Sequence, residues 1–108
     1  MAITIQQLFA PLSLGTAASV IYTASAVLKN GRVRLTNTSN AAISVSLYAA
    51  AAAAASGAGN ACLSAKSIAG SDYLDIDVPT LASGDTLRGM ASAAGITVHQ
   101  LDGVLYSA

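Results

Sequence analysis

The chain is poor in charge, in large aromatic side chains and in cysteine. Only 9% of its 108 residues are charged, tryptophan is absent, and Phe9 is the single phenylalanine. Alanine makes up about a fifth of the chain and buries little area per residue, so Val, Ile, Leu and Tyr have to supply the core. A chain of this length is expected to form one domain with one modest core.

Five cationic residues balance five anionic ones, which gives a formal net charge of zero. A weakly charged, neutral surface is poorly protected against self-association. This favours a subunit whose surface is covered by its neighbours. The alternative interpretation is a monomer that simply carries little charge. The cations are spread along the chain and form no basic patch, so no nucleic-acid partner is expected.

Cys62 is the only cysteine, so an intrachain disulfide is impossible and a small buried apolar role is expected for it. Residues 1–7 lack the basic start and apolar run of a signal peptide. The longest apolar run, at 47–55, falls short of the ~18 residues that a membrane span needs. We therefore expect synthesis in a cytoplasm and no membrane partner.

The residues that could carry chemistry are few. His99 is the only histidine and is expected to face solvent or a subunit contact. Asp75 and Asp77 are two residues apart on a predicted strand, a spacing that could hold a cation with a third oxygen donor. Arg32 and Arg34 have the same spacing, and ionic pairing between the two sets is the favoured interpretation. No catalytic residue, metal site or cofactor is predicted, and no enzyme activity is expected.

Apolar and polar residues alternate over two runs, 32–36 and 43–48, which a cluster of Asn, Ser and Thr separates. This period of two predicts two half-buried antiparallel strands joined by a turn, with Asn37 and Asn40 capping it. A turn at 84–86 is predicted to lead a further strand back to the core through Leu87 and Met90. The predicted core consists of Val33, Leu35, Ile43, Val45, Leu47, Leu87, Ile96 and Val98.

Further short strands are predicted at 18–24, 61–68, 71–78, 86–91 and from 96 onward. Asn30-Gly31 marks either a tight hairpin turn or a bulge within one strand over 27–37. About seven to nine short strands with frequent turn signals are typical of a sandwich or barrel. We predict an all-β fold, a single-domain antiparallel β-sandwich that is jelly-roll-like, with an N-terminal arm.

The predicted arm covers residues 1–15 and the sandwich residues 16–108. Pro11 interrupts the arm, so it is expected to reach a neighbouring subunit rather than form an internal strand. The alanine run at 49–55 is more readily a loop of small side chains than a short helix. Its small side chains could let another backbone approach closely, or the run could be a surface loop that tolerates changes in sequence; the sequence does not choose between these two interpretations. The candidate subunit contacts are Ile3, Ile5, Leu8, Phe9, Ala51 and Ala53.

Four segments resemble small virion proteins of tailed bacteriophages. They read RVRLTNTS at 32–39, AISVSLY at 42–48, LASGDTLRGMAS at 81–92 and ITVHQLDGV at 96–104. The resemblance covers roughly residues 20–106, and its motifs are structural rather than catalytic. The chain departs from the pattern at 49–55, where alanines replace a more polar stretch that contains proline and glycine.

The resemblance implies a structural component of a bacteriophage virion, with a capsid decoration (cement) protein on the head exterior as the first choice. Its partners would be the major capsid protein or other virion proteins, with a homo-oligomer, first of all a trimer, on the particle. A head-to-tail connector or tail structural protein is the alternative. A carbohydrate-binding module is a further one, but the four tyrosines are expected to pack within strands rather than stand exposed.

Overall fold

The computed structural model of the chain describes residues 2–5, 9–51 and 60–107, which form nine strands and no α-helix. The alternating runs of the sequence account for most of them, because a period of two buries one side of each strand. The strands are β1 (Ala2–Ile5), β2 (Leu12–Ser13), β3 (Ser19–Thr23), β4 (Val27–Asn37), β5 (Ile43–Ala51), β6 (Ala61–Ile68), β7 (Tyr73–Val78), β8 (Asp85–Ala91) and β9 (Ile96–Ser107).

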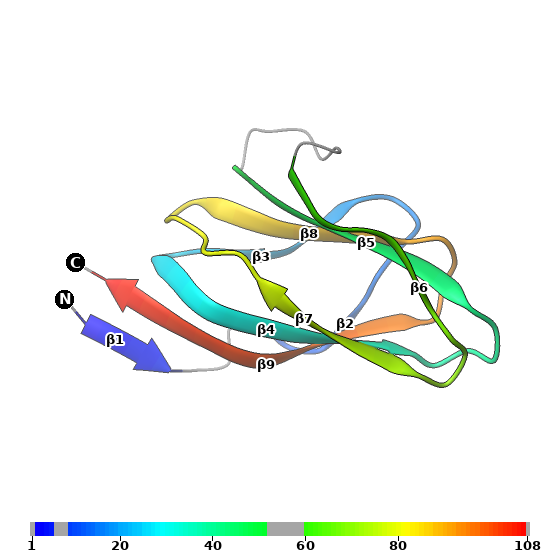
Figure 1. The fold of residues 1–108 in the computed structure, drawn as a ribbon. Coiled ribbons are helices and arrows are strands. Elements are labelled where there is room, and N and C mark those ends of the chain that lie inside the picture. The colour runs from blue at the N-terminus through cyan, green and yellow to red at the C-terminus, as the bar shows by residue number, and fades with distance from the viewer. Residues whose placement is uncertain (1, 6–8, 52–59, 108) are drawn as a thin grey trace.

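The strands form two antiparallel sheets that pack face to face (Figure 1). One sheet has the order β1-β9-β4-β7, with β2 also paired to β9, and we call it the β4 sheet. The other has the order β3-β8-β5-β6, and we call it the β5 sheet. From β2 onward the chain changes sheet at every connection except β5 to β6. This strand order is that of a double-sheet jelly roll, so the predicted fold class is confirmed.

The core lies between the two sheets and contains all eight residues predicted from the alternating pattern. Leu35, Val45 and Leu47 are completely inaccessible to solvent. The same core also holds Leu14 and Leu81, which lie outside the regular alternating runs. Burying a side chain of this size stabilises the fold by about 1.5–3 kcal/mol, so the central Leu and Val residues dominate the stability of the sandwich.

The two alternating runs do not pair with each other, contrary to the simplest interpretation of the sequence. β4 and β5 lie in different sheets, so the turn between them crosses from one layer to the other. Asn37 organises this crossing from a completely buried position. Its amide nitrogen donates to the carbonyl oxygens of Ala41 (2.8 Å) and Ile68 (2.9 Å), and its Oδ1 accepts from the backbone nitrogen and hydroxyl of Ser39. The predicted cap is confirmed for Asn37, while Asn40 is exposed.

Asn30 and Gly31 lie inside one continuous strand rather than in a hairpin turn. β4 runs from Val27 to Asn37, and its pairing with β9 shifts register between Lys29 and Arg32. Of the two interpretations of this dipeptide, the bulge is therefore the correct one. The irregularity leaves β4 long enough to pair with β9 over most of its length and with β7 over its second half.

The N-terminal segment that was expected as an arm pairs with its own sheet. Ala2–Ile5 lies antiparallel to residues 104–107 of β9, and Leu12 and Ser13 pair with Val98 and Thr97. Leu14 is buried in the core. Figure 1 shows β1 beside the end of β9, where both extend past the rest of the sandwich.

Candidate functional site

The outer face of the β4 sheet carries a ladder of opposite charges, which we call the charge ladder: Arg32, Arg34, Asp75 and Asp77. Arg34 of β4 lies opposite Asp75 of β7, and Arg32 lies opposite Asp77. The Arg34 guanidinium donates to both carboxylate oxygens of Asp75, at 2.8 and 3.0 Å. Arg32 lies 3.4 Å from Asp77 and 3.9 Å from Asp75. The pairing interpretation of the two sequence motifs is thus confirmed.

The Arg34 hydrogen bonds, supported by the charges of Arg34 and Arg32, lower the pKa of Asp75 below its ordinary value against the opposing effect of desolvation. The same hydrogen bonds raise the pKa of Arg34. Arg34 also stacks on Tyr73, with 4.2 Å between the guanidinium carbon and the ring centroid. The guanidinium is therefore fixed by both a carboxylate and an aromatic ring, the geometry that suits arginine better than lysine.

Tyr73 is the main aromatic group on this face. Tyr73 is 54% exposed, so the expectation that all four tyrosines pack within strands is wrong for this one. Tyr22 does pack against the core and lies 6.2 Å from the ring of Phe9. The exposure of Tyr73 follows from its position on an edge strand, where the register opposite Thr36 turns the ring outward. The alternating pattern predicted the strand but not its edge position.

His99 of β9 lies in register with Arg34 and is exposed, as expected for a strand histidine that faces outward. Among the residues described, no group of three or more His, Cys, Asp or Glu side chains is placed to hold a metal ion. The carboxylates that could have formed a cation site are paired with arginines instead. The charges of the ladder are therefore satisfied by one another within the sheet.

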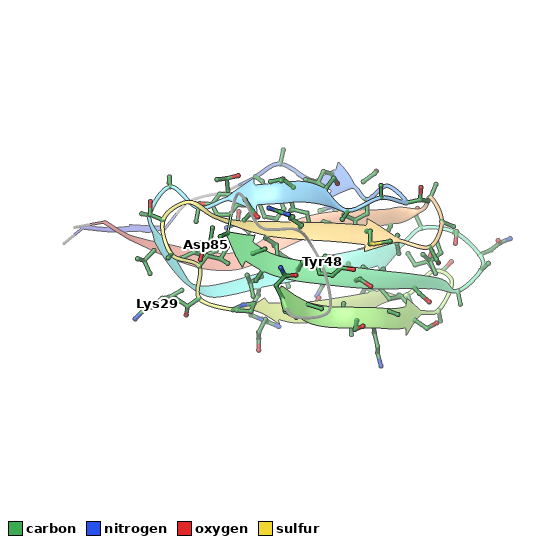
Figure 2. The ribbon with its side chains drawn as sticks, turned by 90° about the horizontal axis from the view of Figure 1, so that it is seen from above. Lys29, Tyr48 and Asp85 are labelled. Atoms are coloured by element: carbon green, nitrogen blue, oxygen red, sulfur yellow. The ribbon has the colours of Figure 1, made fainter. Side chains whose placement is uncertain are left out.

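The outer face of the β5 sheet has a different character. Its outward residues are small, neutral or weakly polar, and we call it the neutral face: Val20, Ser44, Ser46, Tyr48, Ser67 and Met90. Figure 2 looks down on this sheet and labels Tyr48 on β5. The Tyr48 hydroxyl lies 3.6 Å from the sulfur of Met90. The prediction that Met90 points into the core is wrong, because Gly89 is the residue opposite the buried Leu47.

Arg88 is the one charged side chain that faces outward on β3, β5 and β8. It is held along the strand ends: its Nε donates to the Thr86 hydroxyl at 2.9 Å and one terminal nitrogen donates to the Ala51 carbonyl at 3.0 Å. Thr86 in turn donates to the Ala50 carbonyl at 2.8 Å. These bonds hold the guanidinium against the Thr86 hydroxyl and the Ala51 carbonyl. Arg88 lies opposite both Val20 and Tyr48, so the neutral face carries one ionic group, and that group is already hydrogen-bonded within the sheet.

Cys62 is half-buried and packs against the core, in line with the apolar role expected for it. Burial raises the pKa of its thiol against the lowering effect of a backbone hydrogen bond. A thiol with a raised pKa is a poor nucleophile at neutral pH. Cys62 is therefore a packing residue.

The predicted subunit contacts do not gather at one place. Ile3 and Ile5 lie on β1, in register with Tyr106 and Val104 of β9. Phe9 packs against the core of its own chain. Ala51 ends β5 and is exposed. Leu8 and Ala53 lie outside the described residues, as do residues 52–55 of the alanine run. Sequence reasoning missed the neutral face, because its residues become neighbours only through the pairing of β5 with β8 and β6.

No protein-family model, no curated protein sequence and no solved structure matches the chain. Over the described residues, no helix has the length and apolar character that crossing a membrane requires.

Proposed function

We propose that the chain is a structural component of a bacteriophage virion, and specifically a capsid decoration (cement) protein that binds the head exterior. The observation that carries this proposal is the contrast between the two outer faces of the sandwich. The neutral face offers Ser, Val, Tyr and Met side chains for close contact, while the charge ladder pairs its charges and can remain in water. Loss of charge is the compositional signature of the centre of a protein interface.

The fold supports the proposal as well. A jelly roll is a frequent architecture of viral capsid proteins, and its two flat sheets present one surface to each side. The neutral face would lie against the major capsid protein or a neighbouring copy of the chain, and the charge ladder would face solvent. In this arrangement the protein forms a homo-oligomer on the particle, a trimer if the sites follow the local threefold axes that the sequence resemblance implies.

Add-back to particles that lack the chain tests this proposal. Purified chain is mixed with particles made from a genome in which its coding sequence is deleted, and bound chain is measured after sedimentation. The wild-type chain is expected to bind with saturation. Ser44→Arg, which places a charge on the neutral face, should weaken binding, whereas Thr36→Arg, beside the charge ladder on the outer face of the β4 sheet, should not; both positions are half-buried in the free chain. Equal binding by both variants, or no binding by the wild type, would contradict the proposal.

One observation favours a second candidate function, a carbohydrate-binding module. Tyr73 is an exposed ring beside a fixed guanidinium and two carboxylates, groups that sugar-binding surfaces use for stacking and hydrogen bonding. Titration calorimetry with oligosaccharides, for the wild type and Tyr73→Ala, separates the two functions. Saturable heat that Tyr73→Ala abolishes would favour the carbohydrate-binding function.

A further inference from the structure

The β4 sheet is bordered by β1 and the two-residue β2 on one side and by β7 on the other, and the β5 sheet is bordered by β3 and β6. Pro11 directly precedes β2. An outer strand exposes backbone N–H and C=O groups that can pair with another chain. Natural proteins block such edges with charges, proline, bulges or short strands. The four edges of this chain differ in how well they are blocked.

Both edges of the β5 sheet are irregular. The pairing of β6 with β5 shifts register between Val45 and Leu47, next to Ala65, whose φ is positive at 45°. Lys66 follows directly and is exposed. β3 has a register shift between Val20 and Tyr22, in the middle of its five residues. A bulge twists the edge away from a straight partner, so neither strand presents a regular ladder.

β7 is regular but carries charge. It pairs with β4 without interruption, and its outward side chains include Asp75 and Asp77, after which Pro79 follows the strand. A second copy that paired antiparallel with β7 would bring these carboxylates close to their own counterparts. Like charges opposed across a strand pair are destabilising, so β7 is blocked against self-pairing.

β1 is short, with four residues, but it has no charge, proline or bulge. Its sequence, AITI, contains no charged residue and no proline, and it pairs with β9 in a regular register from Ala2↔Ser107 to Ile5↔Val104. It also lies beside the end of β9, where both strands extend past the rest of the sandwich (Figure 1). Among the edge strands that the structure describes, β1 is therefore the longest one that has neither a charge, nor a flanking proline, nor a register shift.

We propose that the outer edge of β1 pairs antiparallel with β1 of a second copy of this chain, around a twofold axis. The contact would join two five-stranded β4 sheets into one continuous sheet. A second copy fits because an uncharged strand is complementary to itself, and an isologous contact uses the same patch on both subunits. The inference rests on the self-association of the proposed function, but the twofold contact pairs free copies in solution and is separate from a threefold arrangement on the particle.

Sedimentation equilibrium of the full-length chain tests the contact. The wild type is expected to show a reversible monomer–dimer equilibrium at micromolar concentrations. Thr4→Lys places a charge on β1 of both copies and should weaken the dimer by about tenfold or more, a change of about 1.4 kcal/mol or more. The matched control is Ser64→Lys on the bulged edge of β6, which should dimerise like the wild type. Circular dichroism checks that each variant is folded.

A wild-type chain that stays monomeric, a trimer as its smallest assembly, or dimers of Thr4→Lys as stable as those of the wild type would overturn the inference. If Thr4→Lys fails to fold, Thr4→Cys in a Cys62→Ser background decides the question. A short bis-maleimide should link its copies in pairs and leave Ser64→Cys in the same background unlinked, and equal linking of both would overturn the inference. A monomer in solution would leave the add-back result untouched, so the two proposals can fail separately.

Discussion

Arg34 of β4 and Asp75 of β7 lie directly opposite each other and are joined by two parallel hydrogen bonds of 2.8 and 3.0 Å. The two residues are 41 positions apart in the chain, so the bond ties the edge strand of the β4 sheet to its centre. Because Arg34 and Asp75 already hydrogen-bond each other on the outer face, neither charge is left for an ion pair with another protein. The pair therefore contributes to both the sheet and the character of its surface.

The lowered pKa of Asp75 makes stability sensitive to acid. Because the pKa in the folded state lies below that of the unfolded chain, the contribution of Asp75 is complete at neutral pH. It is expected to decrease as the pH falls below the ordinary value of 3.8 and to vanish once the pH has passed the folded value. Urea unfolding at pH 7 and pH 3 measures the difference.

Asp75→Asn should reduce the loss of stability between these two pH values, because the variant has no carboxylate to protonate. Asp77→Asn is the matched control, because the Asp77 side chain is 89% exposed and its contact with Arg32 is longer, at 3.4 Å. This control should retain the acid sensitivity of the wild type. An unchanged pH dependence in Asp75→Asn would refute the assignment.

The central leucines are expected to dominate the stability of the sandwich. Leu35→Ala or Leu47→Ala should lower the free energy of unfolding by about 2–5 kcal/mol, because each leaves a cavity between the sheets. Ser44→Ala, on the opposite side of β5 from Leu47, should change it by less than about 0.5 kcal/mol. Chemical denaturation measures all three variants. Small losses at both leucines would mean that the faces of the strands are reversed.

Asn37 is expected to be the most important polar residue of the fold. Asn37→Ala removes four hydrogen bonds and leaves the Ile68 carbonyl oxygen without this donor in a buried site, while the Ala41 carbonyl still accepts from the Ser39 hydroxyl. Each buried group left without a partner costs about 1–3 kcal/mol, so the variant should be severely destabilised. Asn40→Ala, at an exposed position of the same turn, is the control and should stay within about 0.5 kcal/mol of the wild type. Equal stabilities of the two variants would contradict this role.

The sequence predicted the strands and the core better than it predicted how the strands combine. Alternation sets which side of a strand is buried, and for this reason Val45 and Leu47 were placed correctly. Alternation does not say which strand is the neighbour. β4 and β5 look like a hairpin along the chain, yet the buried amide of Asn37 stabilises a crossing between sheets. Such a contact between distant segments leaves no periodic signal.

The surfaces were predicted only in part, for the same reason. Equal spacing of Arg32, Arg34, Asp75 and Asp77 indicated a cross-strand pairing, since one register satisfies both pairs at once. The neutral face was not predicted, because serines and a methionine are ordinary residues in any single strand. Their common character appears only when β3, β8, β5 and β6 are placed side by side.

The central claim is that the chain is part of the exterior of a phage head, and electron cryomicroscopy of particles tests it most directly. Particles from the genome that encodes the chain are compared with particles from which its coding sequence is deleted, and an antibody fragment against the chain marks its position. The proposal predicts additional density of the size of one jelly roll at regular positions on the head, absent from the deletion and labelled by the fragment. Identical heads in both samples, with the label on the tail or nowhere, would contradict it.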